Sequence, residues 1–362
     1  MSRSERWRLA LDAVGRAMWQ MPNSFGIAEC LGRHYSLRCV LFHHVAESET
    51  DFTRGLGVTT TPKDFESALK FLVRYYTPIS LQDVVAESSG QRLPSRPVLI
   101  TFDDAYASVR EVAAPLCQKY GVPAVFFVNA AFLDNRRLAF DNLVCYAANV
   151  MGLDQIRAAA DEVSSTDHVD LLSVKDVFNH FVAAISLPTR EAFGKALIDG
   201  LGIDEAQLAN AANLYLTTQQ LRDLRDFNIE IGNHTYTHVN CRHLTRHDLD
   251  GEIDRNKTEL EALSGREVKS FSVPYGSAAD LPNDLVLHLK CTGHKSAFLV
   301  DGVANQSHMD HFGFNRISVK AAADAELFSA IEILPRFRSI RNRVSSIVSP
   351  VTGSPNLALG DR

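Results

Sequence analysis

Short runs of β-branched and aromatic residues alternate with helical patterns along most of this 362-residue chain. Several runs are apolar on both faces, which is typical of strands buried in a parallel sheet. The helical patterns between them begin with capping signals, such as Thr61 followed by Pro62 and Asp64. Strands that alternate with capped helices predict βα units, and hence a barrel or a doubly wound sheet. The expected strands are 37–42, 97–102, 124–128, 229–231, 268–273, 296–300 and 314–319.

The alternation also suggests how the chain is organised. Residues 37–335 read as one α/β domain, interrupted at about 132–215 by helical patterns without a clear strand. We interpret this segment as a helical insertion. Residues 1–36 form an N-terminal amphipathic helical segment, and residues 336–362 are expected to be a basic, flexible C-terminal tail.

The N-terminal segment carries an apolar stripe at helical spacing, with arginines on its other faces. Its members are Trp7, Leu11, Val14, Met18 and Met21. A helix of this kind can make a peripheral contact with a membrane surface. The simpler interpretation is that the stripe packs against the helix's own domain, and we favour it.

The composition limits the function and the compartment. A net charge of −6 gives no support to nucleic-acid binding, and 46% hydrophobic residues are typical of a soluble globular protein. Six dispersed cysteines without a C-x-x-C pair favour a reducing compartment. Neither a secretory signal nor an apolar stretch of ~20 residues is evident. We therefore expect a cytoplasmic protein, with the inner face of the membrane as one location, whereas nothing indicates its oligomeric state.

Three of the expected strands run into polar clusters. The strand 97–102 is followed by Asp103 and Asp104, and the strand 229–231 leads to His234 and His238. The strand 268–273 leads to the turn Pro274-Tyr275-Gly276, which could present a backbone N–H to a ligand. Each cluster alone has a simple explanation, such as a helix cap or a chance pair of histidines. In a parallel α/β fold, however, the carboxyl ends of all strands lie on one face, where such folds place their sites.

The residue types in these clusters suit a metal site. Two imidazoles four residues apart can face one ion, and a carboxylate completes a three-ligand set that leaves open positions. Neighbouring side chains on an extended chain point in different directions, so one aspartate can bind the metal while the other faces a reacting water.

The clusters, in this order and spacing, resemble the motifs of the polysaccharide deacetylase family, also known as NodB-homology or carbohydrate esterase 4 proteins. The resemblance covers roughly residues 37–320 apart from the insertion. It implies a distorted (β/α) barrel of about seven parallel strands and metal-dependent hydrolysis of N-acetyl groups on amino sugars. Carried over to this sequence, Asp104, His234 and His238 would bind the metal, and Asp103 would be the catalytic base. Zinc is the usual metal, and the ligand set also suits Co2+, Ni2+ or Mn2+.

The expected general acid, which must protonate the leaving amine, comes from elsewhere in the chain. Many family members supply it from a late Leu-His motif, and nothing after Gly276 matches that pattern cleanly. The strand 37–42, however, runs into His43 and His44, which resembles the Tyr-His motif of exopolysaccharide-type members with an early catalytic histidine. We expect His43 to be the acid, with His44 second. The alternative is a pair of histidines in a surface loop.

Two positions depart from the family pattern. Ala105 stands where a glycine usually follows the aspartate pair, which is a small change if that backbone has a negative φ. Ser272 stands where an arginine often orients the base. Arg316 could take over that role from the strand 314–319, or it could form a surface ion pair. We also expect Asn129 and Asp141 to contact sugar hydroxyls and the backbone N–H of Tyr275 to stabilise the reaction's oxyanion.

The resemblance, together with the residue types at the site, therefore implies a carbohydrate N-deacetylase, a hydrolase of linear amide bonds. Its substrate would be an N-acetylated amino-sugar unit of a surface-glycan precursor or polysaccharide. One alternative is the removal of another N-acyl group, such as formyl. Another is a catalytically inactive carbohydrate-binding homologue. An Fe(II) oxygenase, which also uses two histidines and a carboxylate, fits less well because a second aspartate adjoins the ligand.

Overall fold

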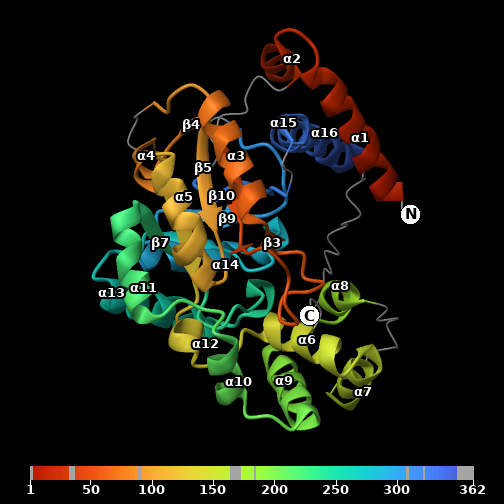
Figure 1. Ribbon diagram of the computed structural model, residues 1–362, viewed down its shortest axis with the longest axis vertical. Helices are drawn as coiled ribbons and strands as arrows, with labels where there is room; N and C mark the ends of the chain where they lie inside the picture. The colour runs from red at the N-terminus through yellow and green to blue at the C-terminus, as the bar shows by residue number, and fades with distance from the viewer. Residues whose placement is uncertain are drawn as a thin grey trace, which may run out of the picture.

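A closed ring of parallel strands forms the centre of the molecule (Figure 1). The computed structural model describes residues 3–31, 37–87, 92–163, 173–182, 185–306, 310–320 and 323–348. Neighbouring strands pair in parallel around the ring, and the pairing of the first with the second closes it. The seven strands of the barrel are β1 (Arg38–Phe42), β5 (Pro97–Phe102), β6 (Ala124–Val128), β7 (Ile229–Asn233), β8 (Ser270–Ser272), β9 (Ser296–Leu299) and β10 (Phe312–Ser318). The predicted (β/α) barrel is therefore confirmed, and each expected strand coincides with one of the seven.

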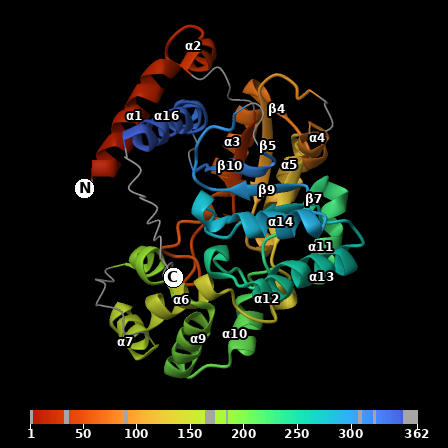
Figure 2. The ribbon, with the colours of Figure 1, turned by 180° about the vertical axis from the view of Figure 1, so that it is seen from behind.

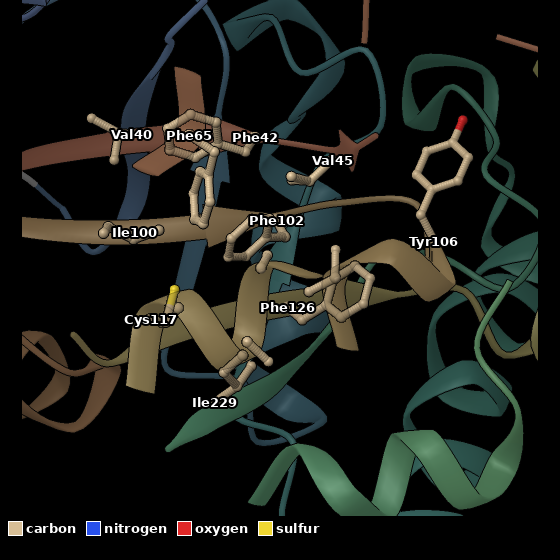
Figure 3. Close-up of a cluster of buried hydrophobic side chains, with 14 of the residues drawn as sticks. Val40, Phe42, Val45, Phe65, Ile100, Phe102, Tyr106, Cys117, Phe126 and Ile229 are labelled. Atoms are coloured by element: carbon tan, nitrogen blue, oxygen red, sulfur yellow. The ribbon is translucent and has the colours of Figure 1, made fainter. Parts of the chain in front are cut away.

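The strands are apolar on both faces because each face packs into a separate core. Phe42, Phe102 and Phe65 gather on the outer face, where the ring centroids of Phe42 and Phe65 lie 4.9 Å apart (Figure 3). The alternate residues, such as Leu99 and Phe127, fill a second cluster. A strand that is apolar on one face only could not line both cores.

Helices on the outside connect successive strands. The helix α3 (Pro62–Tyr75) begins as predicted, because the hydroxyl of Thr61 accepts a hydrogen bond of 3.1 Å from the backbone N–H of Asp64. The other helices around the barrel are α4 (Leu81–Glu87), η1 (Val109–Ala113), α5 (Ala114–Lys119), α11 (Thr218–Asp223), η4 (Leu224–Phe227), η5 (Cys241–His243), α12 (Arg246–Leu249), η6 (Asp250–Asp254), α13 (Arg255–Ser264), η7 (Ala278–Asp280) and α14 (Asn283–Cys291). Three two-residue strands were not expected from the sequence: β2 (His44–Val45), β3 (Thr59–Thr60) and β4 (Thr77–Pro78).

The segment read as a helical insertion follows β6 and lies beside one end of the barrel (Figure 1). Its described residues contain helices and no strand, while 164–172 and 183–184 lie outside the described residues. An apolar cluster of its own, which includes Phe140, Phe193 and Leu197, holds most of these helices together. The helices are η2 (Ala130–Asn135), α6 (Phe140–Val150), α7 (Leu153–Val163), α8 (Val174–Asp176), η3 (Val177–Val182), α9 (Leu187–Leu201) and α10 (Glu205–Ala212). Of these, η2 and α10 pack in the main core instead.

Helices from the two terminal parts of the chain pack together away from the insertion. Figures 1 and 2 both place α1 (Arg3–Trp19) beside α16 (Leu334–Val348), and α2 (Ser24–Leu31) follows α1. The short helices α15 (Asp324–Phe328) and η8 (Ser329–Ile333) lie under α1. None of the described helices is both long and apolar enough to cross a bilayer.

The C-terminal segment differs from the expected flexible tail. Helix α16 continues to Val348, and only residues 349–362 of that segment lie outside the described residues. The helix is held because Arg336 is buried and pairs with the buried Glu332 one turn earlier. The carboxylate of Glu332 also accepts hydrogen bonds from Arg38 of β1 (2.9 Å) and Tyr76 (2.9 Å). This ion pair joins the C-terminal helices to the barrel.

Candidate metal centre and active-site cavity

A cavity of about 530 Å³ lies at the carboxyl ends of the barrel strands. The polar clusters of β5, β7 and β8 meet there, as the parallel topology predicts. The insertion supplies one wall through residues such as Phe132, Asp141 and Phe178. The barrel therefore supplies the polar clusters of the cavity, and the insertion encloses it on one side.

Asp104, His234 and His238 converge in this cavity. The Oδ1 atom of Asp104 lies 3.3 Å from Nε2 of His234 and 3.4 Å from Nε2 of His238. One ligand atom from each residue lies within 4.8 Å of the other two. Asp104 follows β5 and His234 follows β7, so two strand ends that are far apart in sequence supply the set. The structure thus brings together the three residues expected to bind a metal.

Hydrogen bonds fix which nitrogen of each imidazole faces the centre. The Nδ1 atom of His234 lies 2.8 Å from the carbonyl oxygen of Ser272, which can only accept, so Nδ1 carries the proton. The Nδ1 atom of His238 lies 3.0 Å from Oδ2 of Asp141. Both Nε2 atoms are left to act as ligands, which is how histidines are oriented at metal sites.

The residues present fit a divalent metal ion. The Oδ1 atom of Asp104 is buried and has no hydrogen-bond partner among the described residues, which is costly unless a cation or another donor satisfies it. Burial raises the pKa of Asp104, but the imidazoles of His238 and His234 more than offset this and hold the pKa well below its ordinary value. Asp104 is therefore a carboxylate at neutral pH. Two imidazole nitrogens and a carboxylate oxygen suit zinc and the neighbouring transition metals.

Asp103 is bound by Arg316, the residue that we expected to replace the arginine absent at position 272. Arg316 binds both carboxylate oxygens of Asp103, at 2.7 and 2.8 Å, and also donates to Oγ of Ser272 at 2.7 Å. The alternative of a surface ion pair is wrong, because Arg316 is only 1% exposed. Burial raises the pKa of Asp103, whereas Arg316 lowers it, and the net pKa lies below the ordinary value. The carboxylate is charged, fixed in orientation and 3.6 Å from Nε2 of His234.

The two early histidines differ in their surroundings. His43 is half-buried at the end of β1 and lines the cavity. His44 is buried, and its Nδ1 atom lies 3.1 Å from the hydroxyl of Thr59. Burial lowers the pKa of His43 and lowers that of His44 to about 4. Of the two, His43 is the one placed to meet a bound molecule.

Asp141 and Asn129 have contacts that the sequence did not predict. Asp141, in the first turn of α6, accepts a hydrogen bond of 2.7 Å from the hydroxyl of Tyr275 in addition to its contact with His238. It lines the cavity, but its carboxylate orients a ligand of the metal set. Asn129 corrects our expectation of a sugar contact. It is fully buried, and its amide donates to the backbone carbonyls of His234 and Thr235 (2.9 Å), behind the cavity.

The backbone at the site is strained. Asp104, Ala105, His238 and Tyr275 have positive φ values of 76°, 58°, 56° and 60°. The replacement of the usual glycine by Ala105 is therefore not the small change expected for a negative φ, since left-handed backbone is unfavourable for alanine. Such strain is typical of sites whose surroundings force an unusual geometry.

Comparison with known proteins gives a consistent result. The sequence profile of the polysaccharide deacetylase family matches residues 90–177 and 192–294. No curated protein sequence matches the chain. Among solved structures, the Streptococcus pyogenes deacetylase PplD in complex with acetate is 14% identical and has a TM-score of 0.55; the match covers 83% of this chain and 99% of that one.

Two further solved structures are similar. IcaB from Ammonifex degensii is 15% identical over 82% of this chain and 97% of that chain, with a TM-score of 0.52. BC0361, a polysaccharide deacetylase from Bacillus cereus, is 14% identical over 82% of this chain and 68% of that chain, with a TM-score of 0.50. At these low sequence identities, the structural similarity is evidence for the fold alone.

Proposed function

Because this chain belongs to the polysaccharide deacetylase family, a family of carbohydrate hydrolases, we propose that it is a metal-dependent N-deacetylase. It would hydrolyse the acetamide of an amino-sugar unit. The observation that carries the proposal is the convergence of Asp104, His234 and His238 beside Asp103, whose orientation Arg316 fixes. A binding protein would need the three ligands but not a second, oriented carboxylate.

Asp104, His234 and His238 would hold the metal through Oδ1 and the two Nε2 atoms. Zinc is our first choice, and cobalt, nickel or manganese would also suit these donors. When bound, such an ion polarises the acetyl carbonyl and lowers the pKa of an attacking water.

Asp103 would act as the general base. Its carboxylate is charged, lines the cavity and lies next to the ligand set, so it can accept a proton from the attacking water. Arg316 would keep both oxygens in place throughout the reaction, because its two contacts prevent the carboxylate from rotating.

His43 would donate the proton that the leaving amine needs. It lines the same cavity as Asp103, and although burial lowers the pKa of His43, the carboxylates of Asp104 and Asp103 favour the protonated form that the step requires. The backbone N–H of Tyr275 would donate to the carbonyl oxygen as charge develops there. Tyr275 lines the cavity on the side of His238.

The substrate would be an N-acetylated amino sugar within a surface-glycan precursor or a polysaccharide, and we place the reaction in the cytoplasm. A cavity of about 530 Å³ falls within the range that accommodates small ligands. It therefore suits a short stretch of sugar units.

The test is an assay for acetate release from N-acetylated oligosaccharides. We expect turnover that a chelator abolishes and zinc restores, and loss of turnover with retained zinc content in the variant His43→Ala. Release of formate from N-formylated sugars, without acetate release, would instead favour an N-deformylase. A protein that binds zinc and glycan but never turns over would refute the hydrolase. Unchanged turnover in His43→Ala would refute only the assignment of the acid.

A further inference from the structure

Helix α1 exposes an apolar stripe that its packing leaves uncovered. Trp7, Val14 and Met21 are 62%, 44% and 48% exposed, and the exposed Ala10 and Ala17 lie between them at spacings of three and four residues. Residues at this spacing lie on one face of a helix. The stripe extends over about 20 Å from Trp7 to Met21, which follows the end of the helix.

The orientation of α1 is fixed, so this exposure does not come from a loosely attached helix. Met18, next to the exposed stripe, is buried, and Trp19 on the other side of the helix packs edge-to-face on Phe25. Gly15 lies so close to Ser329 of η8 that a side chain at this position would clash. The hydroxyl of Ser329 also donates to Asp12 of α1 at 2.8 Å. The sequence stripe therefore divides, with Met18 turned inward and Trp7 and Val14 outward.

The surroundings of the stripe are basic. Helix α16 has no acidic residue, although the whole chain has a net charge of −6, and besides the buried Arg336 it contains Arg338, Arg341 and Arg343. Arg8 of α1 and Arg341 of α16 are both exposed. Burial and the positive charges of Arg8 and Arg341 lower the pKa of Arg338, because α1 and α16 bring the three guanidinium groups together. Ile340, 48% exposed, adds an apolar side chain from α16.

We propose that α1 and α16 form a docking surface for anionic lipid membranes, with the outward stripe of α1 inserted among the headgroups and the arginines above them. An exposed tryptophan beside arginines is the combination that binds at a lipid interface. The cluster of Arg8, Arg338 and Arg341 selects a negatively charged surface. It also disfavours pairing of this face with a second copy of the chain, because like charges would meet.

This surface is separate from the metal centre, so the proposal does not depend on the proposed deacetylase activity. The stripe and the basic cluster belong to α1 and α16, which lie away from the insertion (Figures 1 and 2), whereas residues of the insertion line the cavity. Docking through α1 would hold the enzyme at a membrane while leaving its cavity to meet a substrate.

The test is co-sedimentation of the full chain with vesicles. We expect binding to vesicles of phosphatidylcholine mixed with phosphatidylglycerol, no binding to phosphatidylcholine alone, and weaker binding as salt rises. The double variant Trp7→Ser and Val14→Ser should weaken binding about tenfold or more. Arg8→Gln and Arg341→Gln should each weaken it about fivefold. The matched control is Leu287→Ser on α14, whose side chain is 61% exposed and which should bind like the unaltered protein.

A second measurement locates the contact. Brominated lipids should quench tryptophan fluorescence in the unaltered protein and quench it much less in Trp7→Phe. Equal binding of all variants, or equal binding to neutral vesicles, would overturn the proposal. So would a dimer by size-exclusion chromatography that Trp7→Ser dissolves without any binding to vesicles, since the stripe would then be a protein interface. Melting temperatures of the variants show that they are folded.

Discussion

Replacing Asp141 should weaken metal binding, although this residue is not one of the three ligands. Its Oδ2 atom lies 3.0 Å from Nδ1 of His238, and its Oδ1 atom accepts a bond of 2.7 Å from the hydroxyl of Tyr275. Burial lowers the pKa of His238, whereas the charge of Asp141 raises it, and the net shift is upward. Asp141 therefore makes the imidazole both more basic and better oriented than it would otherwise be.

The expected size follows from these contacts. Loss of a carboxylate that supports a metal-bound histidine typically costs about 10- to 100-fold in metal affinity. Asp141→Asn keeps an oxygen that can accept from Nδ1 of His238 but removes the charge, so we expect about a 10-fold loss. Asp141→Ala removes both, and we expect about a 100-fold loss, or about 2.7 kcal/mol.

The assay is competition for zinc between the protein and a chromophoric chelator of known affinity. Tyr275→Phe is the matched control, because it removes the other partner of Asp141 while leaving the contact with His238. Its zinc affinity should stay within about twofold of the unaltered protein. Our original expectation, a sugar contact, predicts the opposite pattern: a higher KM for substrate with unchanged zinc affinity. That pattern in Asp141→Asn and Asp141→Ala would refute the reasoning.

Three further predictions concern two buried charged residues and one buried histidine. Arg316→Gln should lower the free energy of unfolding by about 3 to 5 kcal/mol, because Asp103 would stay buried without its partner. It should also abolish turnover. Urea denaturation measures the first effect and acetate release the second. Glu332→Gln should lower the free energy of unfolding by ~3 kcal/mol, as measured by urea denaturation. Asp199 is exposed, so Asp199→Asn should leave the free energy of unfolding nearly unchanged. Burial lowers the pKa of His294 to about 3, so the unfolded state takes up a proton below its ordinary pKa of 6.5 and the folded state does not. Between pH 6.5 and 5 the protein should lose about 2 kcal/mol more stability than His294→Gln, and equal losses in urea titrations would contradict this.

The barrel could be predicted because its strands carry a strong local signal. Runs such as 97–102 and 124–128 are apolar on both faces, and each meets two cores. No local sequence signal indicates that β1 pairs with β5 to close the ring, because strand pairing and its register depend on contacts between distant segments. The two-residue strands β2, β3 and β4 are too short to show any period.

The convergence of Asp104, His234 and His238 could also be predicted, but the contacts that support these residues could not. Asp104 and His234 lie within two residues of a strand's end, and parallel strands bring their carboxyl ends to one face. Asp141 lies on a helix whose position depends on how the insertion packs, which no short-range pattern records. The basic run near the C-terminus was misread for a related reason. Arg336 forms a helix contact with Glu332 four residues earlier, and only burial reveals that this pair belongs to the core.

The positions of Ser272 and Arg316 show that an arginine from β10 contacts Asp103 across the position where the family pattern has an arginine on β8. Ser272 lies on β8, and its small side chain leaves space for the guanidinium of Arg316, which enters from β10. The hydroxyl of Ser272 then accepts one of the guanidinium hydrogens and lies 3.3 Å from Asp103, so the serine is part of the arrangement. An arginine at both positions would place two positive charges beside one carboxylate in a buried space, which is costly. The absence of arginine at position 272 and its presence at 316 are therefore a single structural feature, and the motif that departs from the family pattern retains an oriented carboxylate at Asp103.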